Sequence, residues 1–309
     1  MIRRNRTKYK LFMIAFILGS TILYCEFLAY EIQRFKWSGR ECNECVKVLL
    51  VADPQILGEK NENYFGAWFA RWDNDRYLAK TFTRAMSHAQ PDVIVFLGDL
   101  MDEGHISTMQ DFSRYKSRFD RIFQTPEHIL TIYLPGDNDI GGEEDSVSAA
   151  IHNRFKFAFS QPDYLTHKSL SFYKVIKELS PQVIFTAHEH KAMHLSLDTT
   201  IDELSDIWVL PPHETSLYQL RLDMGDIHEL QIPTCSYRMG TVNMGYGLAY
   251  IDTHEKSVDF TILWLPERFP KLKGYLWVFS IVMTFILSSF ICNCCAWSTH
   301  VAYSHLPAV

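Results

Sequence analysis

Four short apolar segments, each followed at once by acidic, amide or imidazole residues, dominate the middle of the chain. They are VKVLLVADPQ (46–55), DVIVFLGD (92–99), HILTIYLPGDND (128–139) and PQVIFTAHEH (181–190). Uninterrupted β-branched and aromatic residues are typical of strands that are buried on both faces. Open α/β sheets bind ligands at the carboxyl ends of such strands. The pattern therefore predicts four strands whose polar ends meet at one edge.

The segments between and after these strands indicate the rest of the fold. Helical spacing of apolar residues predicts four helices, one capped by Asp73 or Asn74 and running to about Ala89, and the others over Ser107–Phe123, Ser146–Phe159 and Ser169–Leu179. Phe112, Tyr115, Phe119 and Phe123 form one stripe, which we expect in the core. From Ile207 to Leu265 the pattern changes to strands. This order predicts an α/β sandwich of two mixed sheets flanked by helices.

Both ends of the chain carry a stretch long and apolar enough to span a bilayer. Leu11–Tyr30 contains one acid, Glu26, and Gly274–Trp297 contains no charge. We therefore expect transmembrane helices over 11–30 and 274–297, a cytosolic N-terminus (1–10), a luminal domain (31–273) and a cytosolic tail (298–309). A cleaved signal peptide is the alternative for the first stretch, and a buried core helix is the alternative for the second.

The charges beside the two stretches disagree about orientation. Five basic residues precede the first stretch, which favours a cytosolic N-terminus. Lys271 and Lys273 precede the second stretch and no basic residue follows it, which argues the other way. Because the first helix usually decides the topology, we expect the central domain in the lumen. A phosphatase that faces the cytosol is the remaining option.

Composition narrows the class of protein further. The 309-residue chain has a net charge of −6, which argues against nucleic acid as a partner. Its seven cysteines are odd in number and too few for a disulfide scaffold. Cys42 and Cys45 form a CxxC pair without a second such pair, so a local disulfide or two free thiols is favoured over a zinc half-site. A loop with Tyr64, Phe65, Trp68 and Trp72 could be a lid, touch lipid or simply pack.

The acids and histidines together indicate metal chemistry. A single Asp after an apolar strand is often only a turn or cap residue. Three such strand ends followed by a His-x-His indicate a metal site instead. In such a site both imidazoles can point to one place, and a carboxylate between two cations can bridge them. Two divalent metals about 3.5–4 Å apart can stabilise the attacking and leaving oxygens of a displacement at phosphorus. Mixed imidazole and carboxylate ligands suit Mn, Fe or Zn better than Ca.

The order of these motifs resembles the calcineurin-like metallophosphoesterases. ADPQILGE, FLGDLMDEG, GDNDIGGE and the two terminal apolar stretches are most similar to membrane-anchored members that remodel GPI anchors. The resemblance implies a phosphodiesterase with two divalent ions, expected to be manganese, that removes ethanolamine-phosphate from the second mannose of the anchor. It also implies a multi-pass protein of endoplasmic reticulum exit sites, the ER–Golgi intermediate compartment or the Golgi. GPI-anchored proteins, whose ER-to-Golgi transport such enzymes support, would be its partners.

Carried over by position, the resemblance assigns the metal ligands. Asp53 and His190 would bind the first ion, and Asp99 would bridge both. Asp137 and His188 would bind the second ion. Asp137 as a turn residue and His188 as a satisfied strand-end histidine remain as alternatives.

The sequence departs from the family pattern at several positions. Gln55 stands where the family has a ligand histidine, and a neutral amide is a weaker ligand. Asp137 replaces the usual Asn, and Asn138 replaces a His on the phosphate side, so that a proton donor is lost. His105 and His213 are weak substitutes for it.

A further strand-end histidine of the family, in an H-x-P turn, has no counterpart between Asp139 and His188. His167 is a weak candidate for its role. These departures leave an alternative function, a shortened and catalytically impaired membrane protein that binds cargo.

Overall fold

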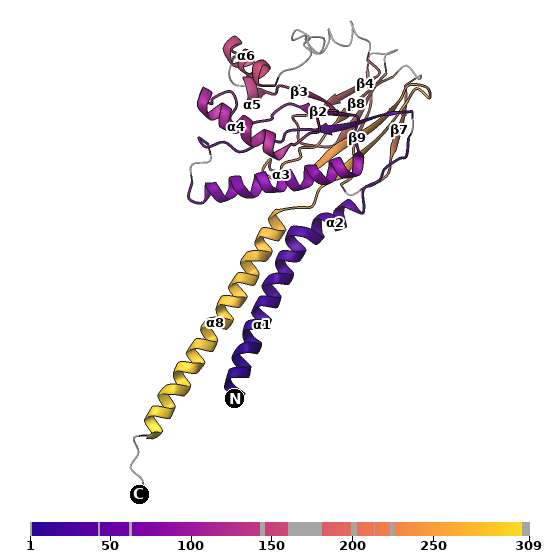
Figure 1. The fold of residues 1–309 in the computed structure, drawn as a ribbon. Helices are drawn as coiled ribbons and strands as arrows, with labels where there is room; N and C mark the ends of the chain where they lie inside the picture. Colours follow the sequence, from indigo (N-terminus) through magenta and orange to yellow (C-terminus); the bar gives the residue numbers. More distant parts are fainter. Residues whose placement is uncertain are drawn as a thin grey trace. The chain divides into compact units, whose positions relative to one another are not determined.

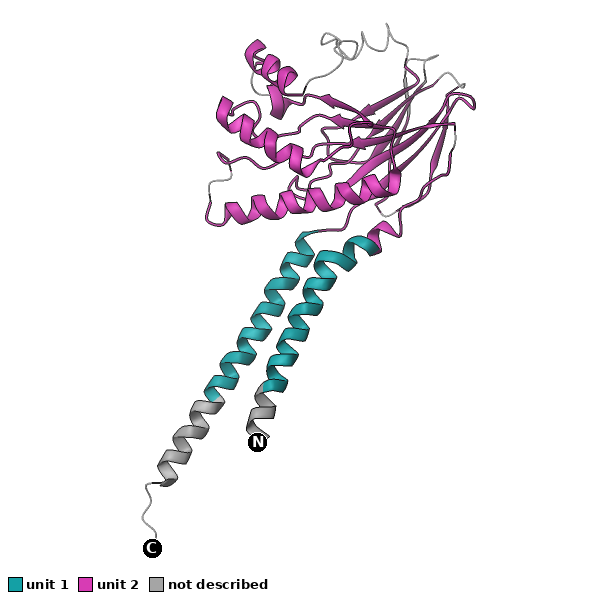
Figure 2. Ribbon diagram, in the orientation of Figure 1, with its two compact units in different colours: residues 1–31, 268–309 teal, residues 32–267 magenta. Residues whose placement is uncertain are grey.

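The computed structural model describes residues 2–42, 44–61, 64–142, 146–159, 181–198, 203–212, 214–222 and 226–304. It divides into two compact units, residues 1–31 with 268–309 and residues 32–267 (Figure 2). Three predicted features lie outside the described residues: the helix expected over Ser169–Leu179, His167 and His213.

The larger unit contains two mixed β-sheets (Figure 1). The first has the order β3-β2-β1-β9-β10-β7, with the bounds β1 Val46–Val51, β2 Val93–Leu97, β3 Leu130–Leu134, β7 Tyr218–Arg221, β9 Gly245–Asp252 and β10 Ser257–Trp264. The second has the order β4-β8-β5-β6, with β4 Val183–Thr186, β5 Met193–Asp198, β6 Glu203–Val209 and β8 Ile227–Gln231. The predicted sandwich of two mixed sheets is confirmed.

The fourth strand of the predicted set does not join the other three. β1, β2 and β3 are parallel neighbours, so that their carboxyl ends do meet at one edge. β4 instead pairs in parallel with β8, with Val183 opposite His228, in the second sheet. The edge at which all four strand ends were expected to meet is therefore formed by three neighbouring strands of one sheet, because strand β8, more than forty residues further along the chain, provides the partner for β4. β5, absent from the sequence prediction, lies on the other side of β8.

Helices cover the parallel half of the first sheet (Figure 1). Their bounds are α3 Ala67–Ala89, α4 Met109–Ile122, the single turn α5 Asp137–Ile140, and α6 Ala149–Ala158. The aromatic side chains of α4 that the sequence placed in the core are buried as predicted, and the Phe119 ring lies 5.1 Å from that of Phe96 on β2. The Phe82 ring of α3 lies 5.1 Å from that of Phe123. Aromatic contacts therefore bind α3 and α4 to the sheet that carries the acids.

Helix α3 begins earlier than its sequence indicates. Gly66, with a φ of +88°, is the residue before its first turn, and Asp73 and Asn74 lie inside the helix. Both are buried because they have distant partners. The Tyr237 hydroxyl donates to Asp73 Oδ2 at 2.8 Å, and the Ser236 hydroxyl donates to Asn74 Oδ1 at 3.4 Å. The cap prediction is wrong because each of these side chains accepts a tertiary hydrogen bond from within the helix instead of capping its first turn.

A second apolar cluster lies between the two sheets. It includes Val48 and Leu50 of β1, Leu230 of β8 and Phe260 of β10, all of which are buried. Alternate residues of β1, Leu49 and Val51, are fully buried as well. Because successive side chains of a strand point to opposite faces, β1 is buried on both sides, as its sequence predicts.

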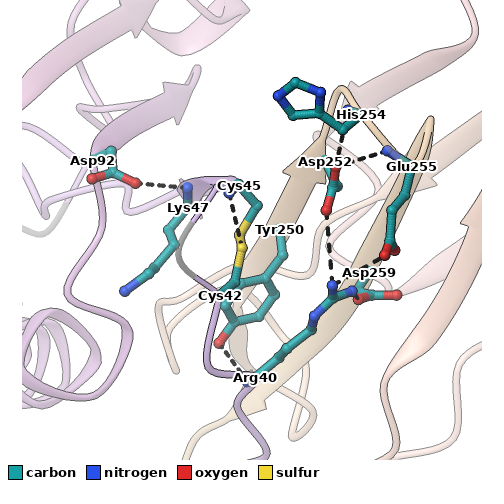
Figure 3. The surroundings of a disulfide bond; sticks show 10 residues. All are labelled: Arg40, Cys42, Cys45, Lys47, Asp92, Tyr250, Asp252, His254, Glu255 and Asp259. Carbon is teal, nitrogen blue, oxygen red and sulfur yellow. Dashed lines mark hydrogen bonds and ion pairs between the residues drawn. A yellow bond between two sulfur atoms is a disulfide. The ribbon is translucent and has the colours of Figure 1, made fainter.

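The segment before β1 is attached to the antiparallel half of the first sheet (Figure 3). Cys42 and Cys45 form a disulfide, one of the two favoured expectations. Arg40 pairs with Asp259, and its backbone N–H donates to the Tyr250 hydroxyl at 3.1 Å. The disulfide therefore lies in an ordered stem rather than in a free tail.

The smaller unit consists of two helical segments (Figure 2). The first segment consists of α1 Ile2–Leu23, a π-helical turn over Tyr24–Leu28 and α2 Ala29–Arg34, of which α2 extends past the boundary of the unit. The second segment is α8 Phe269–Ser304. By length and composition, Lys8–Arg34 and Phe269–Ile291 could each cross a membrane, with mean hydropathies of 2.0 and 1.9. The span boundaries and the orientation stay predictions.

Candidate metal centre

Three predicted ligands meet at one point of the larger unit. One oxygen each of Asp99 and Asp137 and one ring nitrogen of His188 all lie within 4.8 Å of one another. Asp99 follows β2, Asp137 begins α5 just after β3, and His188 follows β4. The centre is thus built by parallel strand ends of the first sheet and by one loop of the second.

Asp99 is the most firmly held of the three. Its side chain is 3% exposed, and Oδ1 accepts a hydrogen bond from the Asn138 backbone N–H at 3.0 Å. Oδ2 accepts from Asn138 Nδ2 at 3.1 Å and from Gln55 Nε2 at 3.0 Å. Three donors therefore fix the orientation of this carboxylate.

Asp53 connects the two sheets at the centre. It is 1% exposed, and its Oδ2 accepts a hydrogen bond from the His188 backbone N–H at 3.2 Å. Its own carbonyl accepts from the Thr234 hydroxyl at 2.7 Å. The loop after β4 thus reaches the strand ends of the other sheet, although β4 does not pair with them.

The two histidines differ in their surroundings. His188 Nδ1 lies 3.3 Å from Asp137 Oδ1, and its side chain is 55% exposed. His190 is half-buried, and burial lowers its pKa, while the backbone of Met239 hydrogen-bonds to it. A lowered pKa keeps the imidazole neutral near pH 7, the form that binds metal.

The electrostatics of the centre favour a cation. Burial, followed by repulsion from Asp99, raises the pKa of Asp53 to about 7. Burial, followed by repulsion from Asp137, also raises the pKa of Asp99. Adjacent buried carboxylates repel one another unless a positive charge separates them. The donor set of carboxylates and imidazoles therefore fits a divalent metal of the Mn, Fe or Zn type.

Unusual backbone conformations gather at the same place. In the described part of the chain, seven residues other than glycine have positive φ, and five of them are predicted site residues. These are Asp53 (45°), Gln55 (37°), Asp99 (50°), His188 (86°) and His190 (56°). Such left-handed residues cost energy and persist where the surrounding structure enforces them, commonly at functional sites.

Two buried acids that the sequence analysis passed over support the loops of the centre. Asp139 is fully buried, and its two oxygens accept hydrogen bonds from the backbone N–H groups of Leu100, Met101 and Gly136, each at 3.0 Å. Glu103 is also fully buried and accepts from the backbone N–H groups of Glu59 and Lys60. Each follows another acid closely in the sequence, Asp102 before Glu103 and Asp137 before Asp139, so the local pattern did not distinguish the buried acid of each pair.

The remaining candidates take other positions. Gln55 directs its Nε2 at Asp99, so in this conformation its amide acts as a donor. Asn138 donates to Asp99 twice, through backbone and side chain. His105 Nδ1 lies 3.1 Å from the carbonyl oxygen of Asn138, to which it can only donate. His105 is thus adjacent to the centre through Asn138.

Comparison with known proteins agrees with this geometry. The model of the calcineurin-like phosphoesterase family matches residues 46–208, which contain the ends of β1, β2, β3 and β4 that carry the centre. The chain belongs to this family. The predicted class of enzyme, a metal-dependent hydrolase of phosphoric esters, is confirmed at the level of the family.

The similarity to curated relatives extends over only part of the length of each relative. Metallophosphoesterase 1 of Xenopus laevis is 32% identical over 169 residues, covering 51% of this chain and 40% of the relative. Metallophosphoesterase 1 of Ailuropoda melanoleuca is 28% identical over 179 residues, covering 55% and 44%. The Metallophosphoesterase 1 homolog of Drosophila melanogaster is 26% identical over 165 residues, covering 52% and 42%. The chain therefore spans less than half the length of these relatives.

Among solved structures, that of a metallophosphoesterase from Sphaerobacter thermophilus aligns with 71% of this chain and 88% of its own chain. The sequence identity is 13% and the TM-score is 0.36.

Proposed function

We propose that the chain is a membrane-anchored, metal-dependent phosphodiesterase of the early secretory pathway. Its substrate would be the ethanolamine-phosphate branch on the second mannose of GPI anchors, and its partners would be GPI-anchored proteins on their way from the endoplasmic reticulum to the Golgi. The observation that carries the proposed hydrolysis is the convergence of Asp99, Asp137 and His188 beside the buried Asp53. The choice of substrate rests on the resemblance to anchor-remodelling members of the family.

The residues of the centre suit two divalent ions, for which manganese is our proposal. Asp53 and His190 would hold one ion, Asp137 and His188 the other, and Asp99 would bridge them. Such ions neutralise phosphate charge and activate the attacking water. Asn138 can donate a hydrogen bond to a phosphate oxygen only if its Nδ2 turns away from Asp99. The half-exposed His188 leaves the centre accessible to a substrate.

Two features support a luminal domain between two membrane helices. The helices over Lys8–Arg34 and Phe269–Ile291 have the length and apolar character of spans. The disulfide between Cys42 and Cys45 fits an oxidising compartment, since disulfides are rare in the cytosol. Protease added outside sealed microsomes should leave residues 31–273 intact, and their digestion would favour the cytosolic-facing alternative.

Metal analysis combined with an assay of a soluble phosphodiester, bis(p-nitrophenyl) phosphate, tests the enzyme proposal. We expect two manganese ions per chain and a loss of at least about 100-fold in turnover for Asp99→Asn. Asp120→Asn, on an exposed part of α4 where the acid pairs with Lys116, is the matched control and should keep its turnover.

A non-catalytic, cargo-binding membrane protein is the second candidate. Asn138 favours it, because an amide at this position cannot supply a proton to a leaving group. A chain that binds no metal, or whose turnover is indifferent to Asp99→Asn, would support this second function.

A further inference from the structure

Five aromatic side chains at the start of α3 face outward instead of inward. We call them the aromatic stripe: Tyr64, Phe65, Trp68, Phe69 and Trp72, with exposed fractions of 50%, 105%, 68%, 43% and 50%. Trp68 and Trp72 are four residues apart within α3, and residues at this spacing share one face of a helix. The Phe69 ring contacts both, at 5.9 Å from Trp68 and 5.6 Å from Trp72.

The first two turns of this helix expose aromatic side chains and are followed by buried polar ones, whereas its later turns bury Tyr77, Leu78 and Phe82 as an ordinary surface helix does. Its buried residues include Asp73 (1% exposed) and Asn74 (fully buried), while both tryptophans are exposed. A surface helix of a soluble domain normally presents its polar side to solvent. A contiguous exposed aromatic surface is typical of an interaction site. The stripe therefore requires an occupant.

The position of α3 in the chain's own architecture indicates which occupant. The buried Tyr77 hydroxyl donates to the carbonyl of Pro266 at 3.1 Å. Pro266 lies three residues before Phe269, where the second candidate span begins. Three residues reach at most about 11 Å, and Trp72 lies about 7.5 Å from Tyr77 along the helix axis. Trp72, the nearer end of the stripe, is thus joined to the start of the second candidate span through less than two turns of helix, one hydrogen bond and three residues of chain.

The chemistry of the stripe agrees with lipid headgroups. Tryptophan and tyrosine are enriched at membrane–water interfaces, and arginine beside them attracts phosphate groups. The Arg76 guanidinium lies 5.3 Å from the Trp72 ring, and Arg238 Nη2 donates to the Tyr64 hydroxyl at 3.3 Å. Of the two acids on this helix beside the stripe, Asp73 is buried and Asp75 is neutralised by a bidentate pair with Arg118.

Two successive residues, Arg238 and Met239, connect the stripe to the candidate metal centre. Arg238 contacts Tyr64, and the next residue, Met239, hydrogen-bonds through its backbone to His190. A surface that rests on lipid at Tyr64 would therefore hold the metal centre beside the headgroups.

We propose that the aromatic stripe is a membrane-docking surface, which inserts among the headgroups of the bilayer that anchors the chain. It holds the metal centre toward phosphodiesters carried by lipids. This inference rests on the proposed membrane anchoring, but not on the proposed hydrolysis.

The test uses the full chain in phosphatidylcholine vesicles, with a fluorescent dansyl amino acid in place of Trp68. Two control chains carry the probe at Phe157, which is 90% exposed on α6, and at Trp277, inside the second candidate span. With lipids brominated near the headgroup, we expect emission from position 68 to fall about twofold or more, because the probe lies in the interface. Emission from position 277 should fall as well, and that from position 157 should not.

Each contrary result overturns the inference in a recognisable way. Equal behaviour of positions 68 and 157 means that the stripe does not touch lipid. Emission at position 68 that depends on protein density instead of bromination means that a second chain is the occupant. An unquenched position 277 means that the anchoring itself has failed. None of these readings requires activity, so failure of the proposed hydrolysis remains a separate result.

A kinetic comparison adds a second reading. The paired change Trp68→Ser and Trp72→Ser should lower hydrolysis of a lipid-borne phosphodiester about tenfold, as interfacial contact is lost. Hydrolysis of bis(p-nitrophenyl) phosphate should be unchanged, and Phe157→Ser should affect neither substrate. Equal loss on both substrates would contradict a docking role.

Discussion

A side chain on residue 136 would overlap the carboxylate of Asp99. The Cβ of any larger residue there would meet Asp99 Oδ1 and its backbone N–H, so Gly136 leaves the space in which Asp99 lies. The φ of Gly136 is −102°, which other residues can adopt. Space beside the carboxylate, and not backbone freedom, explains the glycine.

Gly136→Ala should therefore displace Asp99 and impair the centre. We expect about 1–3 kcal/mol of lost stability from overpacking, and turnover about 100-fold lower because the carboxylate is misplaced. Urea unfolding and the bis(p-nitrophenyl) phosphate assay measure these two effects.

Gly66→Ala is the control for Gly136→Ala. Gly66 has a φ of +88° and no atom within 4 Å of its added Cβ, so the change should lower stability through the backbone alone and keep turnover. Equal loss of turnover in both variants would show that destabilisation, not displacement of Asp99, is the cause.

Asn138→His should restore a proton donor beside Asp99. General acid catalysis contributes about 10²–10⁴-fold when the leaving group is poor. We expect faster hydrolysis of an alkyl phosphodiester and little change for bis(p-nitrophenyl) phosphate, whose leaving group needs no proton. Asn138→Gln, which keeps the amide, is the control, and an equal gain on both substrates would argue against acid catalysis.

His194 and His228 should make the larger unit less stable in acid. His194 Nε2 on β5 lies 3.2 Å from His228 Nδ1 on β8, and burial lowers the pKa of both, with His228 adding to the effect on His194. Because their pKa values in the folded state lie below the unfolded value of about 6.5, the unfolded chain binds more protons between these values. Stability therefore falls as the pH drops below about 6.5.

Urea unfolding at about pH 7.5 and about pH 5 measures this loss. The paired variant His194→Gln and His228→Gln should lose less stability between the two pH values than the wild type. His152→Gln, an exposed position on α6, should behave as the wild type does. An unchanged pH dependence in the paired variant would contradict the prediction.

Glu26 and Arg268 should act as one element of the smaller unit. Arg268 Nη1 lies 2.9 Å from Glu26 Oε1, with side chains 4% and 6% exposed, and the Tyr275 hydroxyl donates to the same oxygen at 3.0 Å. Removing one member of a buried ion pair costs about 3–5 kcal/mol, whereas an apolar replacement of both is often nearly neutral.

Thermal unfolding of the full chain in detergent measures this coupling. Glu26→Leu and Arg268→Leu should each lower the transition temperature, and the paired variant should recover most of the loss. Additive losses in the paired variant would show that the two side chains are not coupled.

The sequence by itself predicted strands β1 to β4, the helices between β1 and β3 and the residues that gather at the metal centre. These follow from local rules, since strand-forming runs are recognisable and the carboxyl ends of parallel strands meet at one edge. The assignment of Asp53, Asp99, Asp137, His188 and His190 to particular ions remains a prediction.

Only the tertiary structure decided which sheet β4 joins, because its partner β8 lies far along the chain. It also decided that Asp73 is a buried helix residue, through a hydrogen bond from Tyr237, 164 residues away. It also left Trp68 and Trp72 exposed, which their apolar character alone does not predict. Such outcomes depend on distant partners, and a local pattern of residues carries no record of them.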